Sequence, residues 1–442
     1  MRAFLASSIG VTCAAVLVLP PAVPAGAVPD THTAPAEPSD VPGSTQSLPL
    51  SPLPAPSGRA TGDPTRTAEA AEQGLSEHEV RPFSMVGVVW DDVDTELHGT
   101  VQVRTRALGT TRWSGWQDLE THNAEHAADP GSAERESGTV RGSTAPLWVG
   151  ESDGVAVRVR PESTDPQDRS APAVPLPTGL RLELVDPGKD PQPLPEAGAE
   201  AGDTGDGRTT PLDGSVLPAL SRAETEARSE AEAGLAPGAQ PYIGPRPRII
   251  TRKGWGADEK LREPAFVYTK SVKAAFIHHS ATGNNYKCTQ APSVLRGIYR
   301  YHVKSGGWRD IGYNFAIDKC GNIYEGRAGG VTKAVLGAHT RGFNSNSTGI
   351  AVLGTFTGSN PPAAAVNAIA KLTAWKLGLF GADPRGKATL VSGGGNKFKK
   401  GKKVKLDVIS GHRDGFATEC PGARLYKQLG SVRTSSARLQ GR

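Results

Sequence analysis

Side chains that could bind a metal ion stand at two places in the second half of the chain. His278 and His279 end a short apolar run, and His412 precedes Cys420 by eight residues. Zinc takes imidazole nitrogens and thiolate sulfurs, and a catalytic zinc site combines about three such ligands with one open position for water. Adjacent side chains on a strand point to opposite faces, so only one of the two neighbouring histidines can reach a given ion. Taken alone, this spacing is weak evidence for a shared metal site and favours a set of unrelated residues.

These residues need a fold that brings distant segments together. Short apolar or alternating stretches predict strands at 273–279, 313–317, 349–353 and 403–409. Apolar residues at helical spacing predict helices at 293–304 and 363–379. Strands and helices mixed around one core are typical of an α/β (α+β) domain with a central sheet and flanking helices. We place this domain at residues 246–435.

The preceding half of the chain has a different pattern. Residues 80–187 contain alternating apolar residues, such as Val155 and Val157, in runs broken by Gly, Asp and Pro. This pattern predicts an all-β, sandwich-like domain. Four of the seven tryptophans fall in it. An exposed pair at Trp113 and Trp116 could stack on sugar rings, but a place in the small core is the favoured interpretation.

Two further segments are predicted to lack a fold of their own. Residues 28–79 are dense in Pro, Ala, Ser and Thr, and residues 188–245 are rich in Pro, Gly, Ala and acidic residues. Such stretches contain too few large apolar groups to offset the entropy of ordering the chain. We therefore expect a disordered tract in the first and a linker in the second, where only residues 220–233 could form a transient helix.

Charge is divided unevenly along the chain. Its 442 residues include 50 Lys+Arg and 45 Asp+Glu, a formal net charge of +5. Residues 1–245 carry 17 and 35 of these, a net −18, whereas residues 246–442 carry 33 and 10, a net +23. The basic half favours a polyanionic partner, and cell wall and nucleic acid both qualify. The chain has no Gly-X-Y repeat and no second long apolar run, which excludes a collagen and a multi-pass membrane protein.

The first residues predict export. Arg2 is followed by an apolar stretch through Leu19 and by the small residues Ala25-Gly26-Ala27. This is the pattern of a secretory signal peptide, here residues 1–27, and the apolar stretch is short for a membrane span. We expect the mature protein to be secreted or held in the cell wall, with no membrane attachment.

Several short motifs surround the candidate ligands and occur in a fixed order. They are Lys253-Gly254-Trp255-Gly256-Ala257, Ile277-His278-His279-Ser280-Ala281-Thr282, Trp308-Arg309-Asp310-Ile311-Gly312-Tyr313-Asn314-Phe315, Tyr324-Glu325-Gly326-Arg327, Gly337-Ala338-His339-Thr340, Asn344-Ser345-Asn346-Ser347-Thr348-Gly349-Ile350, Gly411-His412-Arg413-Asp414 and Thr418-Glu419-Cys420-Pro421-Gly422. Together they resemble the peptidoglycan recognition protein family, which includes zinc N-acetylmuramoyl-L-alanine amidases of the phage lysozyme type. The resemblance covers residues 246 to about 433. The whole chain resembles the secreted actinobacterial form, in which a β-rich domain precedes the amidase.

The resemblance implies a fold and a zinc site. The fold is a mixed sheet with three main helices and a groove along one face. The zinc ligands of the family map to His278, His412 and Cys420. In this family a Cys at the last position goes with catalysis, whereas members with Ser there generally bind without cutting. The resemblance therefore makes Cys420 the most informative residue of the sequence.

The resemblance also implies roles for residues around the metal. Tyr313 matches the catalytic Tyr, whose hydroxyl would orient the attacking water or stabilise the oxyanion. Thr418 matches a position that lines the site, where a hydrogen bond is the expected contribution. The general base stays open, and a zinc-bound hydroxide held by the tyrosine is the preferred interpretation. His339 and Asn344 are candidate substrate contacts in the groove, with a structural surface histidine and ordinary turn chemistry as the alternatives.

Export also bears on the cysteines. Without the signal the chain keeps Cys288, Cys320 and Cys420, so that two can pair and one is left as a free thiol or a metal ligand. Cys288 and Cys320 lie near the first strand of the domain and in a turn, and we expect a disulfide between them. The characteristic disulfide of animal family members closes a much shorter loop, so their pairing is not carried over.

Residues 397–405 read Lys-Phe-Lys-Lys-Gly-Lys-Lys-Val-Lys and predict a basic hairpin. It could be a solvated turn or a contact with anionic wall polymers. Nucleic acid fits poorly, because the chain is expected to be exported and has no nucleic-acid motif.

Taken together, the sequence predicts a secreted Zn²⁺-dependent amidase that cleaves between the lactyl group of N-acetylmuramic acid and L-alanine in peptidoglycan. A non-catalytic peptidoglycan-binding protein of the same fold is the alternative. An exported adhesive protein that works through its β domain would leave the metal motifs without a purpose.

Overall fold

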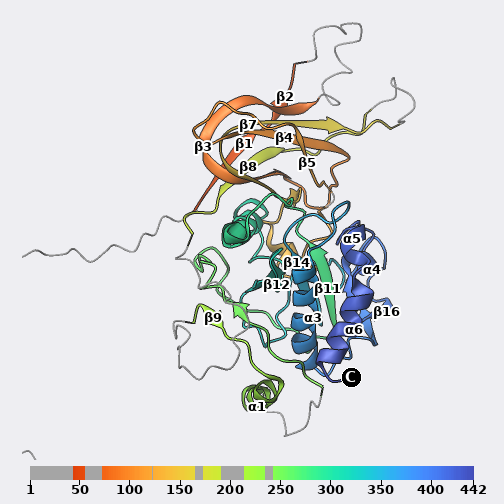
Figure 1. Ribbon diagram of the computed structural model, residues 1–442. Coiled ribbons are helices and arrows are strands. Elements are labelled where there is room, and N and C mark those ends of the chain that lie inside the picture. Colours follow the sequence, from red (N-terminus) through yellow and green to blue (C-terminus); the bar gives the residue numbers. More distant parts are fainter. Residues whose placement is uncertain (1–42, 55–71, 122, 165–172, 191–213, 234–241) are drawn as a thin grey trace, which may run out of the picture. The chain divides into compact units, whose positions relative to one another are not determined.

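The computed structural model describes residues 43–54, 72–121, 123–164, 173–190, 214–233 and 242–442. All of them belong to one compact unit, Val41–Arg442 (Figure 1). The predicted signal peptide, residues 1–27, lies outside the described residues. Within the part of the chain that is described, no helix is long and apolar enough to cross a membrane.

The N-terminal domain is built from antiparallel strands, as predicted. Its strands are β1 (Ser44–Pro49), β2 (Ser51–Pro52), β3 (Gln73–Trp90), β4 (Gly99–Ala107), β5 (Gln117–Leu119), β6 (Gly142–Ser143), β7 (Leu147–Pro161) and β8 (Arg181–Asp186), with a short 3₁₀ turn at Arg135–Ser137. They form one sheet in the order β1-β8-β3-β7-β4-β5, and β2 and β6 also pair with β3. Alternate residues of these strands, such as Val101 and Val103 or Val155 and Val157, are buried in a single apolar core.

Two expectations for this domain are wrong. Residues 28–79 are not disordered throughout, because β1 and the start of β3 lie in this range and β1 pairs with β8. The remaining residues of that tract, 28–42 and 55–71, lie outside the described residues. The core does not take in Trp116, which is 36% exposed. The guanidinium of Arg158 lies 4.1 Å from the centre of its ring instead.

The linker expected at 188–245 also contains regular structure. The strand β9 (Val216–Leu217) pairs with β10 (Ile249–Ile250), and α1 (Arg222–Ala233) follows it. The linker prediction is therefore wrong for β9, which joins the edge of the next sheet, whereas α1 lies where residues 220–233 were expected to be able to form a helix.

The C-terminal domain has a mixed sheet. Its further strands are β11 (Ala274–His279), β12 (Phe315–Ile317), β13 (Ile323–Glu325), β14 (Ser347–Val352) and β17 (Ile409–Gly411), and the sheet order is β17-β11-β14-β12-β13-β10-β9. The central pairs β17–β11, β11–β14 and β14–β12 are parallel. A separate antiparallel hairpin joins β15 (Lys387–Val391) to β16 (Lys403–Asp407).

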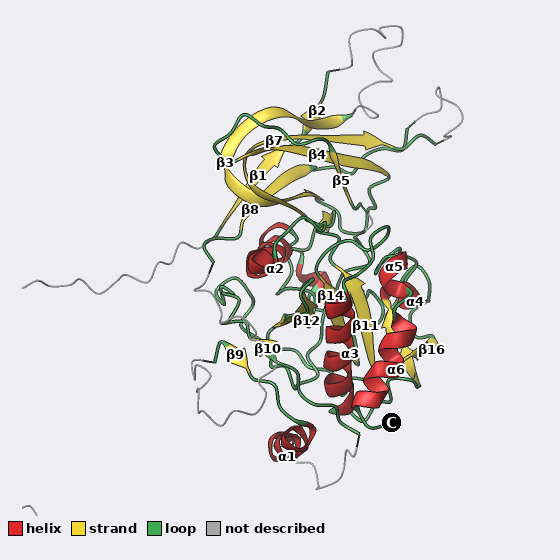
Figure 2. Ribbon diagram, viewed as in Figure 1, coloured by secondary structure: helices red, strands yellow, loops and turns green. Residues whose placement is uncertain are grey.

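Helices cover both faces of this sheet (Figure 2). They are α2 (Ala291–Arg300) with its flanking turns Cys288–Gln290 and Tyr301–Ser305, α3 (Ala363–Gly378), α4 (His412–Gly415), α5 (Ala423–Tyr426) and α6 (Leu429–Leu439). Alternate residues of β14 show the two faces. Ile350 and Val352 pack in the core that contains α3 and α6, whereas Ala351 packs in the core that contains α2. The predicted α/β fold with its preceding β domain is confirmed.

The two domains share one of these apolar cores. Met85 and Val185 of the β domain pack with Ile298 of α2. The buried hydroxyl of Tyr301 donates to backbone oxygens of the β domain, 3.1 Å from that of Thr144. The β domain therefore rests on the α2 face of the C-terminal sheet.

Candidate metal centre

The sheet topology brings two of the predicted ligands together. β11 and β17 are parallel neighbours, and Ile277 pairs with Gly411. His278 and His412 are the next residue of each strand, so both stand at the same edge of the sheet. His412 begins the short helix α4 there, and both side chains are 0% exposed. His279 lies on the opposite face of its strand, as predicted, where its Nδ1 accepts from the Phe356 amide at 3.4 Å.

The loop after α4 turns back to deliver the third ligand. The Arg413 amide donates to the Cys420 carbonyl at 3.0 Å, and the Cys420 amide donates to the Thr418 hydroxyl at 3.0 Å. The thiol of Cys420 then lies 3.7 Å from Nδ1 of His278. The three ligands that the sequence predicted thus meet at one point.

A fourth potential ligand, His126, comes from the β domain, from the connection between β5 and β6. Nε2 of His126 lies 3.5 Å from Sγ of Cys420 and 3.3 Å from Nδ1 of His412. The potential ligand atoms of His126, His278, His412 and Cys420 all lie within 4.8 Å of one another. Tetrahedral zinc with ordinary bond lengths would set N–N and N–S separations of about 3.3–3.6 Å. The residues present therefore fit zinc.

The electrostatics of the cluster also suit a metal. Burial, reinforced by the neighbouring histidines, holds the pKa values of His126, His278 and His412 well below 6.5, so all three rings are neutral. Neutral imidazole is the form that binds a metal. Burial raises the pKa of the Cys420 thiol well above its usual value, so metal binding has to displace its proton.

A second layer of side chains orients the ring of His278. Its Nε2 lies 3.3 Å from Nδ1 of His339 and 3.3 Å from the hydroxyl of Thr340. In turn, the Asn344 side chain accepts from the backbone amides of His339 and Thr340 at 2.7 and 3.0 Å. Such partners fix the tautomer and direction of a metal-binding imidazole.

His339 and Asn344 were predicted to contact substrate in the groove. The structure places both in the interior, 0% and 1% exposed, so the alternative of a surface histidine is wrong. His339 lies behind His278, and Asn344 donates to the Ala127 carbonyl of the β domain at 2.8 Å. A direct contact with substrate stays a prediction for both.

The predicted catalytic pair flanks the cluster. The ring of Tyr313 lies 5.6 Å from that of His278 and 5.9 Å from that of His126, measured between ring centres. Burial raises the pKa of its phenol well above 10, so the hydroxyl stays protonated and can donate. The hydroxyl of Thr418 donates to Glu125 Oε1 at 2.8 Å.

Glu125 and His126 are the residues that sequence reasoning missed. Both are buried, and burial raises the pKa of Glu125 to about 8. They belong to a segment with no metal motif, and the nearest predicted ligand in sequence, His278, lies 152 residues further on. Only the packing of one domain on the other brings them to the site.

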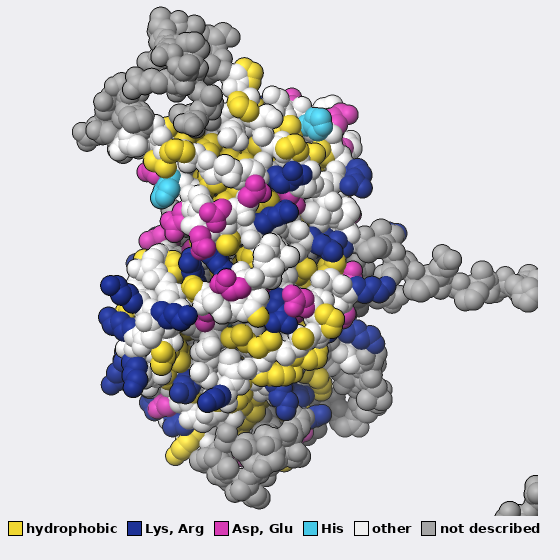
Figure 3. All heavy atoms as spheres, turned by 180° about the vertical axis from the view of Figure 1, so that it is seen from behind, with side chains coloured by type: hydrophobic (Ala, Val, Ile, Leu, Met, Phe, Trp, Pro, Cys, Tyr) yellow, Lys and Arg dark blue, Asp and Glu magenta, His cyan; other side chains and the backbone are white. Residues whose placement is uncertain are grey.

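The remaining predicted features lie away from the centre. Cys288 and Cys320 form the expected disulfide, with an S–S distance of 2.00 Å, and Cys420 is free and buried. Residues 397–405 form the turn and first part of β16 in the β15–β16 hairpin, with their lysines exposed. Lys and Arg side chains are frequent on the surface of the C-terminal domain seen in Figure 3. Contact of this turn with anionic wall polymers stays a prediction.

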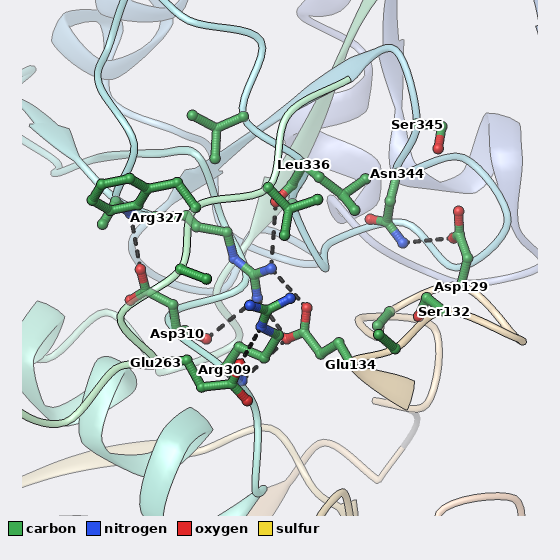
Figure 4. Close-up of a pocket in the computed structure, with 18 of the residues that line it drawn as sticks. Asp129, Ser132, Glu134, Glu263, Arg309, Asp310, Arg327, Leu336, Asn344 and Ser345 are labelled. Atoms are coloured by element: carbon green, nitrogen blue, oxygen red, sulfur yellow. Dashed lines mark hydrogen bonds and ion pairs between the residues drawn. The ribbon is translucent and has the colours of Figure 1, made fainter. Parts of the chain in front are cut away.

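A cavity of about 360 Å³ is lined by residues 128–134 of the β domain and by residues of the C-terminal domain. Figure 4 shows Glu134 of the β domain facing Arg327 within it, and Asn344 facing Asp129. None of the four clustered ligands is among the residues that line it.

Comparison with known proteins assigns both domains. A family model described as N-acetylmuramoyl-L-alanine amidase matches residues 268–423, and one described as Rv3811 N-terminal galactose-binding domain-like matches residues 31–176. Peptidoglycan-recognition protein SC2 of Drosophila simulans is 34% identical over 183 residues, which cover 41% of this chain and 84% of that protein. The chain belongs to the peptidoglycan recognition protein family.

Protein LE matches a similar share of this chain. Peptidoglycan-recognition protein LE of Drosophila melanogaster is 38% identical over 183 residues, 41% of this chain and 45% of that protein. A crystal structure of protein LE in complex with tracheal cytotoxin, a monomeric diaminopimelic acid-type peptidoglycan, is 30% identical and covers 41% of this chain and 92% of that one, with a TM-score of 0.33.

Proposed function

We propose that this family member is a secreted, zinc-dependent N-acetylmuramoyl-L-alanine amidase. The observation that carries the proposal is the convergence of His278, His412 and Cys420, two imidazoles and a thiol with their ligand atoms within 4.8 Å of one another. A family model for this activity matches residues 268–423 around them. Peptidoglycan is the proposed substrate, which agrees with the net +23 charge of residues 246–442, since the wall is polyanionic.

The chain's own residues would divide the work at this centre. When bound, zinc supplies a Lewis acid that activates water and polarises the scissile carbonyl. His278, His412 and Cys420 would hold it, and His339 would keep the ring of His278 in its binding tautomer through the 3.3 Å contact. Tyr313, a phenol that stays protonated, would donate to the oxyanion of the tetrahedral intermediate.

Thr418 has a supporting role in this scheme. Its hydroxyl accepts from the Cys420 amide at 3.0 Å, which fixes the loop that carries the thiol. A hydroxyl of this kind can hold geometry through hydrogen bonds, but it is a poor general acid or base at neutral pH. The proton taken from water would pass to the leaving amine of alanine.

Peptidoglycan binding without cleavage is the second candidate. The two relatives described above, proteins SC2 and LE, are named for recognition. Cys420 argues against binding without cleavage. A protein that only binds peptidoglycan needs no buried thiol beside the neutral imidazoles of His278 and His412. The two candidates therefore differ in one measurable product, a new amino terminus on alanine.

The test measures release of N-terminal alanine from purified peptidoglycan and from tracheal cytotoxin. Because His126 lies at ligand distance, the intact chain and the His126→Ala chain are both assayed, each with zinc and with a chelator. Cys420→Ser in the same backgrounds is the matched variant. Zinc-dependent release that is lost with Cys420→Ser is expected. Binding of tracheal cytotoxin by both zinc-loaded chains with no alanine released by either would leave the recognition function in place of the amidase.

A further inference from the structure

The connection between β5 and β6 is an unusual loop. Loops normally run over the surface because their backbone groups need water. Here Glu125, His126 and Glu134 are 4%, 5% and 6% exposed, and all three face the C-terminal domain. We call residues 123–136 the plug segment.

Contacts hold the plug segment at both ends. Near the metal centre, the Arg341 amide donates to the Glu125 carbonyl at 2.9 Å. Beside it, Asp129 Oδ1 accepts from the Gly342 amide and from the Asn344 side chain, both at 2.7 Å.

At its other end the plug segment is held by a buried ion pair. Both carboxylate oxygens of Glu134 accept from the guanidinium of Arg327 at 2.8 Å, and the Arg309 amide donates to the same carboxylate at 3.2 Å (Figure 4). The two charged side chains are each 7% exposed. The carboxylate of Glu134 thus occupies three hydrogen-bond donors of the basic domain, two of Arg327 and one of Arg309.

His126 decides what this arrangement means for the metal. Three protein ligands leave a zinc ion with an open position, whereas four close it, and closed sites are the structural kind. Nε2 of His126 stands 3.3–3.5 Å from two of the other ligand atoms, at the separation expected between ligands of one tetrahedron. A water molecule and this imidazole would compete for the same position.

We propose that His126 is a fourth protein ligand of the metal and that the plug segment covers the catalytic centre, so that this fold of the chain is a latent form of the enzyme. The claim that this form is latent rests on the proposed amidase function. The claim that His126 is a fourth ligand does not depend on that function. Activation would exchange one neutral ligand for another: Nε2 of His126 would leave and one water molecule would take its position. The hydrogen bonds and the ion pair of the plug segment would have to open for this step, but no covalent bond of the chain would have to break.

The plug segment presents acidic side chains to the basic domain. The carboxyl groups of Glu125, Asp129 and Glu134 meet four donors of the C-terminal domain: the Thr418 hydroxyl, the amides of Gly342 and Arg309, and the Arg327 guanidinium. A peptidoglycan fragment with carboxylates in its stem would need donors of this kind. Glu134, whose pKa Arg327 holds below the usual value although burial alone would raise it, therefore competes with an anionic ligand by charge as well as by position.

The experiment compares the zinc-loaded intact chain with His126→Ala, and with His126→Gln as a second variant that keeps more of the side-chain volume. His98→Ala replaces an exposed histidine of the same domain and is the matched control. The first readout is the rate at which a chromogenic chelator removes zinc. Losing a residue that supports a metal ligand typically lowers metal affinity 10- to 100-fold, and losing a ligand should cost at least as much. Zinc release should therefore be about 10-fold faster or more in the His126 variants.

The second readout is access to the metal. In the cobalt-substituted proteins, azide should change the absorption spectrum of the His126 variants and leave the intact chain and His98→Ala unchanged. The third is amidase rate, which should rise about 10-fold or more in the His126 variants if the intact chain spends most of its time closed.

The outcomes separate the two proposals. Equal zinc release and equal azide response in the intact chain and a folded His126 variant would overturn the fourth ligand. An intact chain as active as its His126 variants would overturn latency. Variants with an open, azide-binding metal and no amidase activity would keep the fourth ligand and overturn the proposed function instead.

Discussion

The buried ion pair between Glu134 and Arg327 should govern how often the plug segment opens. We consider Glu134→Gln, which keeps the volume of the side chain and removes its charge. The carboxylate now accepts two bonds at 2.8 Å from a guanidinium, and both side chains are 7% exposed. Removing one partner of a buried pair costs about 3–5 kcal/mol because the other charge is left uncompensated.

The lower end of this range applies here. Arg327 keeps a bond from its Nε to the Ile311 carbonyl at 2.8 Å, and the carboxylate of Asp310 also acts on its charge. A glutamine can still accept one bond from the guanidinium. We therefore expect a loss of about 3 kcal/mol, which is an opening equilibrium about 150-fold more favourable.

Amide hydrogen exchange measures this opening directly. The amides of Arg341 and Gly342 donate to acceptors of the plug segment, the Glu125 carbonyl and the Asp129 carboxylate. Neither amide touches the mutated side chain, so faster exchange at these positions reports movement of the whole segment. Glu136→Gln, a change of an exposed residue two positions away, is the matched control. Exchange at Arg341 and Gly342 that differs by less than about 2-fold between the two variants would refute the anchoring role of the pair.

Two further predictions concern the ion pair and the ring behind His278. Arg327 holds the pKa of Glu134 below its usual 4.5, although burial alone would raise it, so the ion pair stabilises the closed segment above about pH 4.5 and this stabilisation is lost as the pH falls through the folded-state pKa. Protection factors at the Arg341 and Gly342 amides should therefore fall in acid in the intact chain but not in Glu134→Gln, and identical acid profiles would contradict the assignment. His339→Ala removes the ring that contacts Nε2 of His278, so zinc affinity should fall about 10- to 100-fold while the fold stays intact. A chelator competition measures this affinity. An unchanged affinity would show that Thr340 alone orients the ring of His278.

The C-terminal domain could be predicted well because its signals are local. The apolar run 273–279 became β11 nearly residue for residue, and the apolar spacing at 363–379 became α3. Parallel strands that end at one sheet edge then bring His278 and His412 together without further information. The site's first three ligands follow from this topology and from the turn that carries Cys420.

The β domain was harder to delimit for a physical reason. β1 lies at the edge of its sheet and is only partly buried, so its sequence, Ser-Thr-Gln-Ser-Leu-Pro, lacks the alternation of a core strand. The first half of β3 is likewise mostly exposed. Edge strands with polar residues and proline have the composition of a linker, because the same features that suit a solvated chain also prevent edge-to-edge aggregation.

His126 could not be predicted from any local pattern, and this bears on what the metal motif means. The motif at His278, His412 and Cys420 specifies three ligands, and three ligands define an open site only if nothing else fills the fourth position. In this chain His126, 286 positions before His412, lies with its Nε2 3.3 Å from Nδ1 of His412, and a domain interface that includes Met85, Val185 and Ile298 brings it there. The same three residues therefore belong to a closed centre or an open one according to how the β domain packs, and the state of that interface decides whether a chain with an intact motif can cut.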